Sequence, residues 1–197
     1  MRRFVAILLV VLWQSFPVVA ADKPYLAGRM LVAAPTLSDP YFQWSVVYLV
    51  EHNAEGAFGV IVNRKMGEGP LAELIGDHGF DVPEEMMVPL YFGGPVDMRK
   101  LFVLHSGEYE GIGTQTSPGG ISMTGHRSIY QDILEGKGPK RHRLFLGYAG
   151  WGAGQLEGEI QRGDWFDADP DETVIFEPVD DQQKSWLRAR EKAGLTL

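Results

Sequence analysis

The segment from Asp39 to Arg64 holds the side chains of this sequence that are best suited to acid–base or nucleophilic chemistry. His52 directly follows Glu51, and a histidine beside a carboxylate can accept and return a proton. Ser45 stands on the same predicted strand and could act as a nucleophile if a histidine took its proton. Side chains alternate across a strand, however, so Ser45 and Glu51 share one face while His52 lies on the other. The spacing therefore disfavours a Ser–His pair and favours a hydrogen-bonded histidine at a strand end.

The other patterns that could carry chemistry do not complete a known motif. Segment 150–154 is glycine-rich and lies between a predicted strand and a predicted helix, as phosphate-binding turns do. It lacks the third small residue of the dinucleotide fingerprint and any GKS or GKT ending. The five histidines show no H-x-H or HExxH spacing, so no pattern predicts a metal or another cofactor. Gln155 and Glu159 share one face of a predicted helix, where such pairs are more often structural than catalytic.

Composition limits the classes of protein that this sequence fits. A chain of 197 residues with 45% hydrophobic and 22% charged residues suits one globular domain with a sizeable core. The absence of cysteine excludes disulfides, zinc–thiolate sites, iron–sulfur clusters and a cysteine nucleophile. The net charge of −8 opposes DNA binding, which needs clustered cations. The densest basic run, Lys137–Arg143, is more typical of a solvated turn, so we expect no nucleic-acid partner.

The elements that must position these side chains start with a hairpin. The apolar pattern predicts two strands, Trp44–His52 and Phe58–Asn63, and the turn between them contains Asn53 and Gly56. Further strands are predicted at 30–34, 88–92, 101–105, 121–124 and 144–148, helices at 71–78, 127–135, 155–161 and 180–194, short apolar segments at 165–166 and 174–176, and a mobile glycine-rich loop at 106–120. Grouped strands with a short hairpin predict an α+β fold with an antiparallel sheet.

Residues 1–21 have the three parts of a secretory signal. Arg2 and Arg3 precede an apolar run at 4–13, and small residues follow at 17–21. The apolar run is shorter than the roughly 20 residues that span a bilayer, so we expect no stable membrane span once the segment is removed. The sequence therefore predicts a single domain at 22–197 and an exported, periplasmic protein. Without cleavage, a cytoplasmic protein is the alternative.

Three long segments carry a family resemblance. They read LAGRMLVAAPTLSDPYFQWSVVYLVEHNAEGAFGVIVNR, VPLYFGGPVDMRKLFVLHS and LFLGYAGWGAGQLEGEIQRGDW, and they cover most of the chain from about Leu26 onward. This sequence resembles the AlgH/YqgE-like family of bacterial proteins. The resemblance implies an α+β fold in which a strongly bent, bifurcated sheet folds into a pseudo-barrel flanked by helices. Family members usually begin without a signal-like extension and look cytosolic.

The resemblance implies a site but no chemistry. Family members are often described as transcriptional regulators, and the family has no established biochemical activity that would assign catalytic residues. We expect the polar positions within the matching segments to shape one cleft or the turns that support it. The candidates are Asp39, Ser45, Glu51, His52, Asn63, Arg64, His105, Gln155 and Glu159.

Three functions compete on these observations. A non-enzymatic regulatory protein that binds a ligand or a protein partner fits the absence of a catalytic motif. A hydrolase-like enzyme would need the polar group around His52 to converge in one cleft. A DNA-binding transcriptional regulator conflicts with the acidic charge and with the lack of a helix-turn-helix pattern. Export of the chain would exclude that third function.

Overall fold

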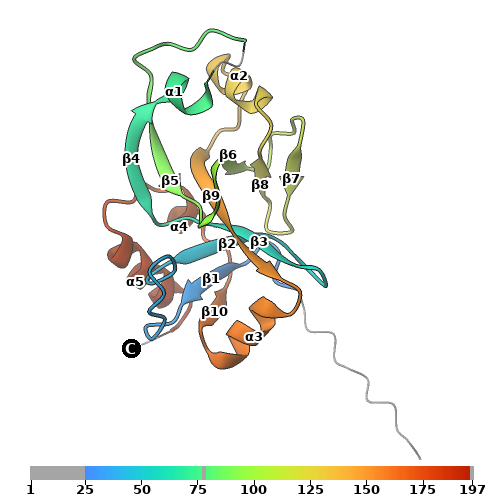
Figure 1. The fold of residues 1–197 in the computed structure, drawn as a ribbon, viewed down its shortest axis with the longest axis vertical. Helices are drawn as coiled ribbons and strands as arrows, with labels where there is room; N and C mark the ends of the chain where they lie inside the picture. The colour runs from blue at the N-terminus through green and yellow to red at the C-terminus, as the bar shows by residue number, and fades with distance from the viewer. Residues whose placement is uncertain (1–24, 77–78, 196–197) are drawn as a thin grey trace, which may run out of the picture.

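The computed structural model describes residues 25–76 and 79–195. In this part of the chain a curled sheet is surrounded by short helices (Figure 1). The strands are β1 (Met30–Ala33), β2 (Val46–Asn53), β3 (Gly56–Ile61), β4 (Lys65–Pro70), β5 (Met87–Phe92), β6 (Val96–Ser106), β7 (Thr114–Thr116), β8 (Ile121–Thr124), β9 (His142–Gly152) and β10 (Trp165–Ala168). The helices are α1 (Leu71–Ile75), α2 (Ser128–Leu134), α3 (Gln155–Arg162), α4 (Glu172–Phe176) and α5 (Gln182–Lys192).

Strand β9 joins the two halves of the sheet because its two ends have different neighbours. Its first half lies between β5, which runs parallel to it, and β6, which is antiparallel. Its second half pairs with β3, and the sheet continues from there through β2 and β1 to β10. The bifurcated, mostly antiparallel sheet curls into a half-barrel with flanking helices, which confirms the predicted α+β class. The β5–β9 pair is a parallel exception to the predicted antiparallel pairing.

Two glycines allow β9 to change neighbours. Gly147 has a φ of +66°, a left-handed conformation that favours glycine. Gly94 packs directly against the backbone of β9, and a Cβ there would lie 2.2 Å from the carbonyl carbon of Tyr148. Both positions therefore require glycine, and they lie where the pairing of β9 passes from β5 at Leu146 to β3 at Ala149.

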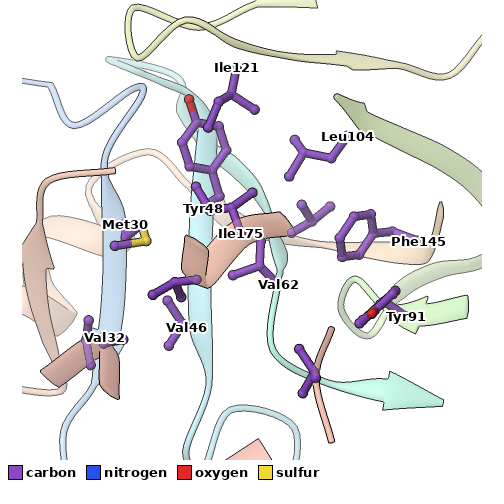
Figure 2. Packing of buried hydrophobic residues seen from close by; sticks show 14 of the residues in the cluster. Met30, Val32, Val46, Tyr48, Val62, Tyr91, Leu104, Ile121, Phe145 and Ile175 are labelled. Atoms are coloured by element: carbon purple, nitrogen blue, oxygen red, sulfur yellow. The ribbon is translucent and has the colours of Figure 1, made fainter. Parts of the chain in front are cut away.

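The largest core cluster fills the inside of the curl (Figure 2). Met30, Val46 and Tyr48 from β1 and β2 face Phe145 of β9 and Ile175 of α4. None of these side chains is more than 1% exposed. Burying a side chain of this size contributes about 1.5–3 kcal/mol. A helix of five residues is not stable alone, so this packing holds α4 in place.

Two further clusters attach the remaining helices. Leu156 of α3 packs with Leu49 and Trp165 on the other face of the β1–β3 strands. Helices α1 and α2 cover the opposite half of the sheet through residues such as Leu71 and Ile129. At the tip of the β2–β3 hairpin, by contrast, Ala54 and Glu55 are exposed.

Several segments differ from the sequence predictions. Residues 65–70 form β4, although their only large apolar side chain is Met66, so no apolar alternation indicated a strand. The apolar segment 174–176 belongs to helix α4, whose start is capped by the side chain of Asp171. Segment 106–120 contains β7, and the buried Ser117 hydroxyl donates to the Ile121 carbonyl. That segment is therefore anchored to the sheet rather than being a free surface loop.

The predicted signal at 1–21 and the predicted domain boundary at residue 22 lie outside the described residues. Both stay predictions. Among the helices within 25–76 and 79–195, none combines the length and apolar character needed to cross a membrane.

Candidate functional site

A shallow hollow opens at the tip of the β2–β3 hairpin, and we call it the hairpin hollow. Its volume is about 200 Å³, and its lining consists of Glu51, Asn53, Glu55, Gly56, Ala57, Phe58 and Trp151. The turn that shapes it is closed by Asn53, whose side-chain oxygen accepts the Glu55 N–H at 2.8 Å.

The side chains that face the hairpin hollow come from neighbouring strands. Register pairs Glu51 with Phe58 and Phe58 with Gly150, while Gly56 pairs with both Asn53 and Gly152. Paired residues and every second residue of a strand share one face of a sheet. These six residues therefore lie on one face, and the three glycines among them leave space beside the carboxylate and the aromatic ring.

The described donors to the Glu51 carboxylate are neutral amides. Its Oε1 accepts from the Asn53 side-chain amide at 2.6 Å, and its Oε2 accepts from that of Gln115 at 2.9 Å. Glu51 and Glu55 are both exposed. Within the described residues, neither carboxylate forms an ion pair. The hairpin hollow thus holds two negative charges that no cation of residues 25–76 and 79–195 compensates.

His52 lies on the opposite face of β2 and is almost fully buried, at 6% exposure. Its Nδ1 accepts the backbone N–H of Leu26 at 2.9 Å, and its Nε2 lies 3.1 Å from Glu157 Oε1. A backbone N–H can only donate, so Nδ1 carries the lone pair and the proton sits on Nε2, facing Glu157. With both nitrogens engaged, the ring has no free lone pair for a substrate.

Gln155 and Glu159 belong to a polar clamp under α3. Glu159 Oε2 accepts from the indole nitrogens of Trp151 at 2.8 Å and Trp165 at 2.9 Å, and its Oε1 accepts from the Gln155 amide at 2.9 Å. The Gln155 side-chain oxygen in turn accepts the Gly152 N–H at 3.1 Å. The contacts with Trp151, Gly152 and Trp165 tie α3 to β9 and β10, and the bond between Gln155 and Glu159 within the helix orients both side chains, so the clamp holds the helix against the sheet.

Ser45 and Asn63 are both fully buried at the start of β2. Asn63 Oδ1 accepts the Val46 N–H at 2.8 Å, and its amide donates to the carbonyls of Trp44 at 2.8 Å and Gln182 at 3.1 Å. The Ser45 hydroxyl has no hydrogen-bond partner among the described residues. Ser45 therefore lacks the base that a nucleophilic serine requires.

Asp39 and Arg64 stabilise the loop that precedes β2. Asp39 Oδ1 accepts the backbone N–H groups of Tyr41 at 2.8 Å and Phe42 at 3.2 Å. The Arg64 guanidinium donates to the Tyr41 carbonyl at 3.2 Å and lies 4.8 Å from the centre of the Phe92 ring. Their partners are backbone groups and an aromatic ring of this chain, which indicates a structural role.

His105 of β6 is fully buried, and its ring bonds across to β8. Its Nδ1 lies 2.9 Å from the Ser106 carbonyl and its Nε2 lies 2.9 Å from the Thr124 hydroxyl. The carbonyl can only accept, so Nδ1 carries the proton and Nε2 accepts from Thr124. Burial lowers the pKa of His105 and outweighs the hydrogen bond to Ser106, so the ring is neutral at pH 7.

The nine candidate residues therefore occupy several separate places. His52, Gln155 and Glu159 lie around α3, and Asp39 lies in the loop before β2, which the Arg64 side chain reaches from the β3–β4 connection. Ser45 and Asn63 are buried, Glu51 faces the hairpin hollow, and His105 bonds from β6 to β8. Within the described residues there is no cluster of side chains suited to hold a metal ion.

Sequence reasoning did not single out Glu55, Phe58 and Gln115 as functional residues. The sequence predicted that Glu55 belongs to a turn and that Phe58 belongs to a core strand. A usable signal was the spacing Glu51-x-Asn53 opposite Gly56-x-Phe58, because that register places a carboxylate next to an aromatic ring. The contact from Gln115 depends on a segment 64 residues away and has no local signal.

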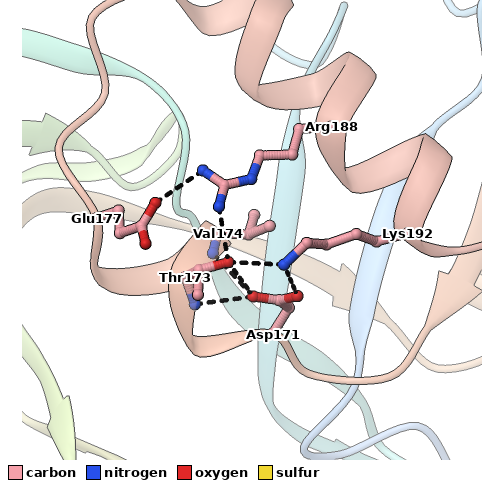
Figure 3. Close-up of polar contacts among 6 residues, drawn as sticks. All are labelled: Asp171, Thr173, Val174, Glu177, Arg188 and Lys192. Atoms are coloured by element: carbon pink, nitrogen blue, oxygen red, sulfur yellow. Dashed lines mark hydrogen bonds and ion pairs between the residues drawn. The ribbon is translucent and has the colours of Figure 1, made fainter.

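The C-terminal helices carry a second polar cluster, and we call it the α4–α5 network (Figure 3). Asp171 accepts from Lys192 and from the Thr173 hydroxyl, and Arg188 pairs with Glu177 at 2.7 Å. Two hollows of about 250 Å³ flank α5. One contains the Arg188–Glu177 pair, and the other contains the Lys192–Asp171 pair. In this region the basic side chains compensate carboxylates of the same hollow.

Comparison with known proteins identifies the family. The model of the AlgH-like family matches residues 30–197. The chain belongs to the AlgH-like family. A UPF0301 protein of Methylococcus capsulatus is 43% identical over 87% of this chain and 93% of its own length. A UPF0301 protein of Jannaschia sp. is 41% identical over 86% of this chain and 88% of its own length.

Solved structures agree with the fold of this AlgH-like chain. The solution structure of the AlgH protein from Pseudomonas aeruginosa is 32% identical with a TM-score of 0.73, over 89% of this chain and 93% of that one. A crystal structure of a protein from Corynebacterium diphtheriae has a TM-score of 0.64 at 24% identity and shares the fold. Membership in the AlgH-like family establishes the architecture and leaves the activity to be argued from the site.

Proposed function

We propose that this AlgH-like protein is a non-enzymatic binding protein and that it recognises a protein partner through the hairpin hollow. The observation that carries this proposal is the pair of exposed carboxylates, Glu51 and Glu55, which lie beside an aromatic ring without any compensating cation among the described residues. Exposed polar and aromatic groups with unused interactions are typical of recognition surfaces.

A hydrolase-like activity around His52 has less support. Both nitrogens of the ring are engaged, with the Leu26 backbone and with Glu157. The Ser45 hydroxyl is buried without a base, and Glu51 lies on the other face of β2. General-base catalysis needs a free lone pair within reach of a substrate proton, and this arrangement supplies none.

Direct regulation through DNA also has less support. In the basic run 137–143, Lys137 pairs with Glu135 and Arg141 pairs with Glu172, each at 2.6 Å. Arg143 is buried, and its guanidinium packs on the Tyr91 ring at 4.5 Å. Phosphate binding requires free cations that displace counterions, and most of the charge in this run is already used.

The proposed function is tested by photo-crosslinking in the native host. A photoreactive amino acid at Ala54, an exposed position of the hairpin turn, should crosslink one reproducible partner that mass spectrometry identifies. The purified partner should then bind the protein in calorimetry. Binding should weaken in Glu51→Gln/Glu55→Gln but persist in the charge-matched control Glu84→Gln/Glu85→Gln, whose carboxylates are exposed elsewhere.

Two results would overturn the proposed function. One is equal affinity of the identified partner for both double variants. The other is turnover of a substrate by the purified protein that is lost in His52→Ala, because that would make the protein an enzyme.

We further propose that the protein is exported through the signal-like segment at residues 1–21, which is supported by its charged, apolar and small-residue parts. Fractionation of the native host followed by intact-mass measurement tests this proposal. A periplasmic form that begins at Ala21 or Asp22 is the expected result. A full-length cytoplasmic form would contradict it.

A further inference from the structure

We infer that the group bound in the hairpin hollow is the side chain of a lysine or arginine presented by the protein partner. This inference rests on the proposed function and names the chemistry of its ligand. Charge, aromatic surface and size each support it.

The charge of the hairpin hollow selects a cation. Of the described residues that line it, two are carboxylates and none is a lysine, arginine or histidine. The donors on Glu51 are neutral amides of Asn53 and Gln115, which orient the carboxylate and leave its charge uncompensated. Each of the two hollows beside α5 has three carboxylates and two basic side chains in its lining, so most of its negative charge is compensated from within. A basic partner would also be steered toward this acidic protein, whose net charge is −8.

The aromatic wall of the hairpin hollow favours a cation that is presented on an apolar stem. Phe58 packs against Tyr148 with ring centres 4.8 Å apart and against Phe102 at 6.0 Å. All three rings are partly exposed. Aromatic faces attract ammonium and guanidinium groups within about 6 Å, and the methylene stems of lysine and arginine pack on apolar surface.

The size of the hairpin hollow favours a single side chain over a metabolite. Small-molecule sites usually measure about 300–1,000 Å³, and this hollow has about 200 Å³ and is widely open. The neighbouring Gly152 shares its face, and a Cβ there would meet no atom within 4 Å. The surface beside the hollow can therefore accommodate the backbone of a partner that inserts one residue.

The inference is tested by NMR titration of the 15N-labelled protein with four probes. These are acetyl-Gly-Lys-Gly-amide, acetyl-Gly-Arg-Gly-amide, the norleucine tripeptide of the same length, and free n-butylamine. The lysine or arginine peptide should shift the amide signals of Gly56 and Gly152 saturably. Glu51→Gln/Glu55→Gln should weaken this binding about fivefold or more, because two ion pairs are lost, while Glu84→Gln/Glu85→Gln leaves it unchanged.

The other probes separate charge from shape. The norleucine peptide should produce no saturable shift, and n-butylamine should bind more weakly than the lysine peptide. Equal binding of norleucine and lysine, or equal loss in both double variants, would overturn the inference. Tighter binding of n-butylamine than of the peptides would overturn it as well, because the hollow would then recognise a free organic cation. If only this titration fails while the crosslinked partner still depends on Glu51 and Glu55, the proposed function stands and the ligand class is wrong.

Discussion

The α4–α5 network and the hairpin hollow both gather carboxylates, but their surroundings differ. Asp171 and Glu177 are paired with Lys192 and Arg188, so their charge is used inside the molecule (Figure 3). The carboxylates of the hairpin hollow face solvent, and the one with side-chain hydrogen bonds, Glu51, receives them from neutral amides. The paired region is explained by stability. The carboxylates of the hairpin hollow form no stabilising ion pair with a described residue, which makes the hollow the better candidate for binding.

The largest expected effect on stability is that of replacing Asp171. Its side chain caps α4 by accepting from the backbone N–H groups of Thr173 and Val174. Replacing it with alanine removes this cap and the pair with Lys192 together. Asp171→Ala should lower the free energy of unfolding by about 2 kcal/mol in urea denaturation. Binding at the hairpin hollow should be unchanged. A loss of less than about 0.5 kcal/mol, the range of ordinary surface changes, would mean that the network is not structural.

A change in the clamp around Glu159 should also lower the free energy of unfolding, but by less than Asp171→Ala does. Glu159→Gln loses the charge that accepts from the indoles of Trp151 and Trp165. We expect a loss of about 1.5 kcal/mol in the free energy of unfolding, with a change in tryptophan fluorescence. Unaltered stability and fluorescence would indicate that the clamp does not hold α3.

The pH dependence of stability isolates the charge of Asp171. Burial alone would raise the pKa of this carboxyl, but Lys192, the Thr173 hydroxyl and two backbone N–H groups favour the ionised form and lower the pKa to about 2. In the unfolded chain the pKa is about 3.9. The stabilisation is therefore present above about pH 4 and lost as the pH falls toward 2.

The matched measurement compares wild type with Asp171→Asn by urea denaturation at several pH values. The difference in free energy of unfolding should be constant between pH 5 and 7 and should shrink between pH 4 and 2. A difference that does not change with pH would contradict a stabilising role for the charge.

The smallest expected effect on stability lies at the hairpin hollow. Glu51→Gln/Glu55→Gln should change the free energy of unfolding by no more than about 0.5 kcal/mol, because no ion pair is broken. The variant Gly152→Lys should also fold, since a side chain there enters open space. Its ammonium would lie on the same face as Glu51 and should weaken partner binding. A large stability loss in the double variant would place the hollow in the same structural class as the α4–α5 network.

The sequence predicted the hairpin and the α+β class because apolar alternation and turn residues are local signals. Strand β4 escaped prediction because Gly67 and Gly69 interrupt any alternation. Whether the candidate residues form one cleft depends on contacts between distant segments, which local patterns do not specify. Alternation along β2 did predict that Glu51 and His52 lie on opposite faces. The hairpin hollow depends on the register that sets Phe58 opposite Gly150, which no local pattern specifies.

A double-mutant cycle between this protein and its crosslinked partner measures whether Glu51 and Glu55 bind a cation of that partner. Glu51→Gln/Glu55→Gln would be combined with a lysine-to-methionine or arginine-to-methionine change at the partner residue that contacts the hairpin. We predict that the two changes are coupled by about 1.5 kcal/mol or more, because either one removes the same interaction. Additive losses of affinity would contradict recognition of a cation at the hairpin hollow, because the carboxylates and the cation would then act independently.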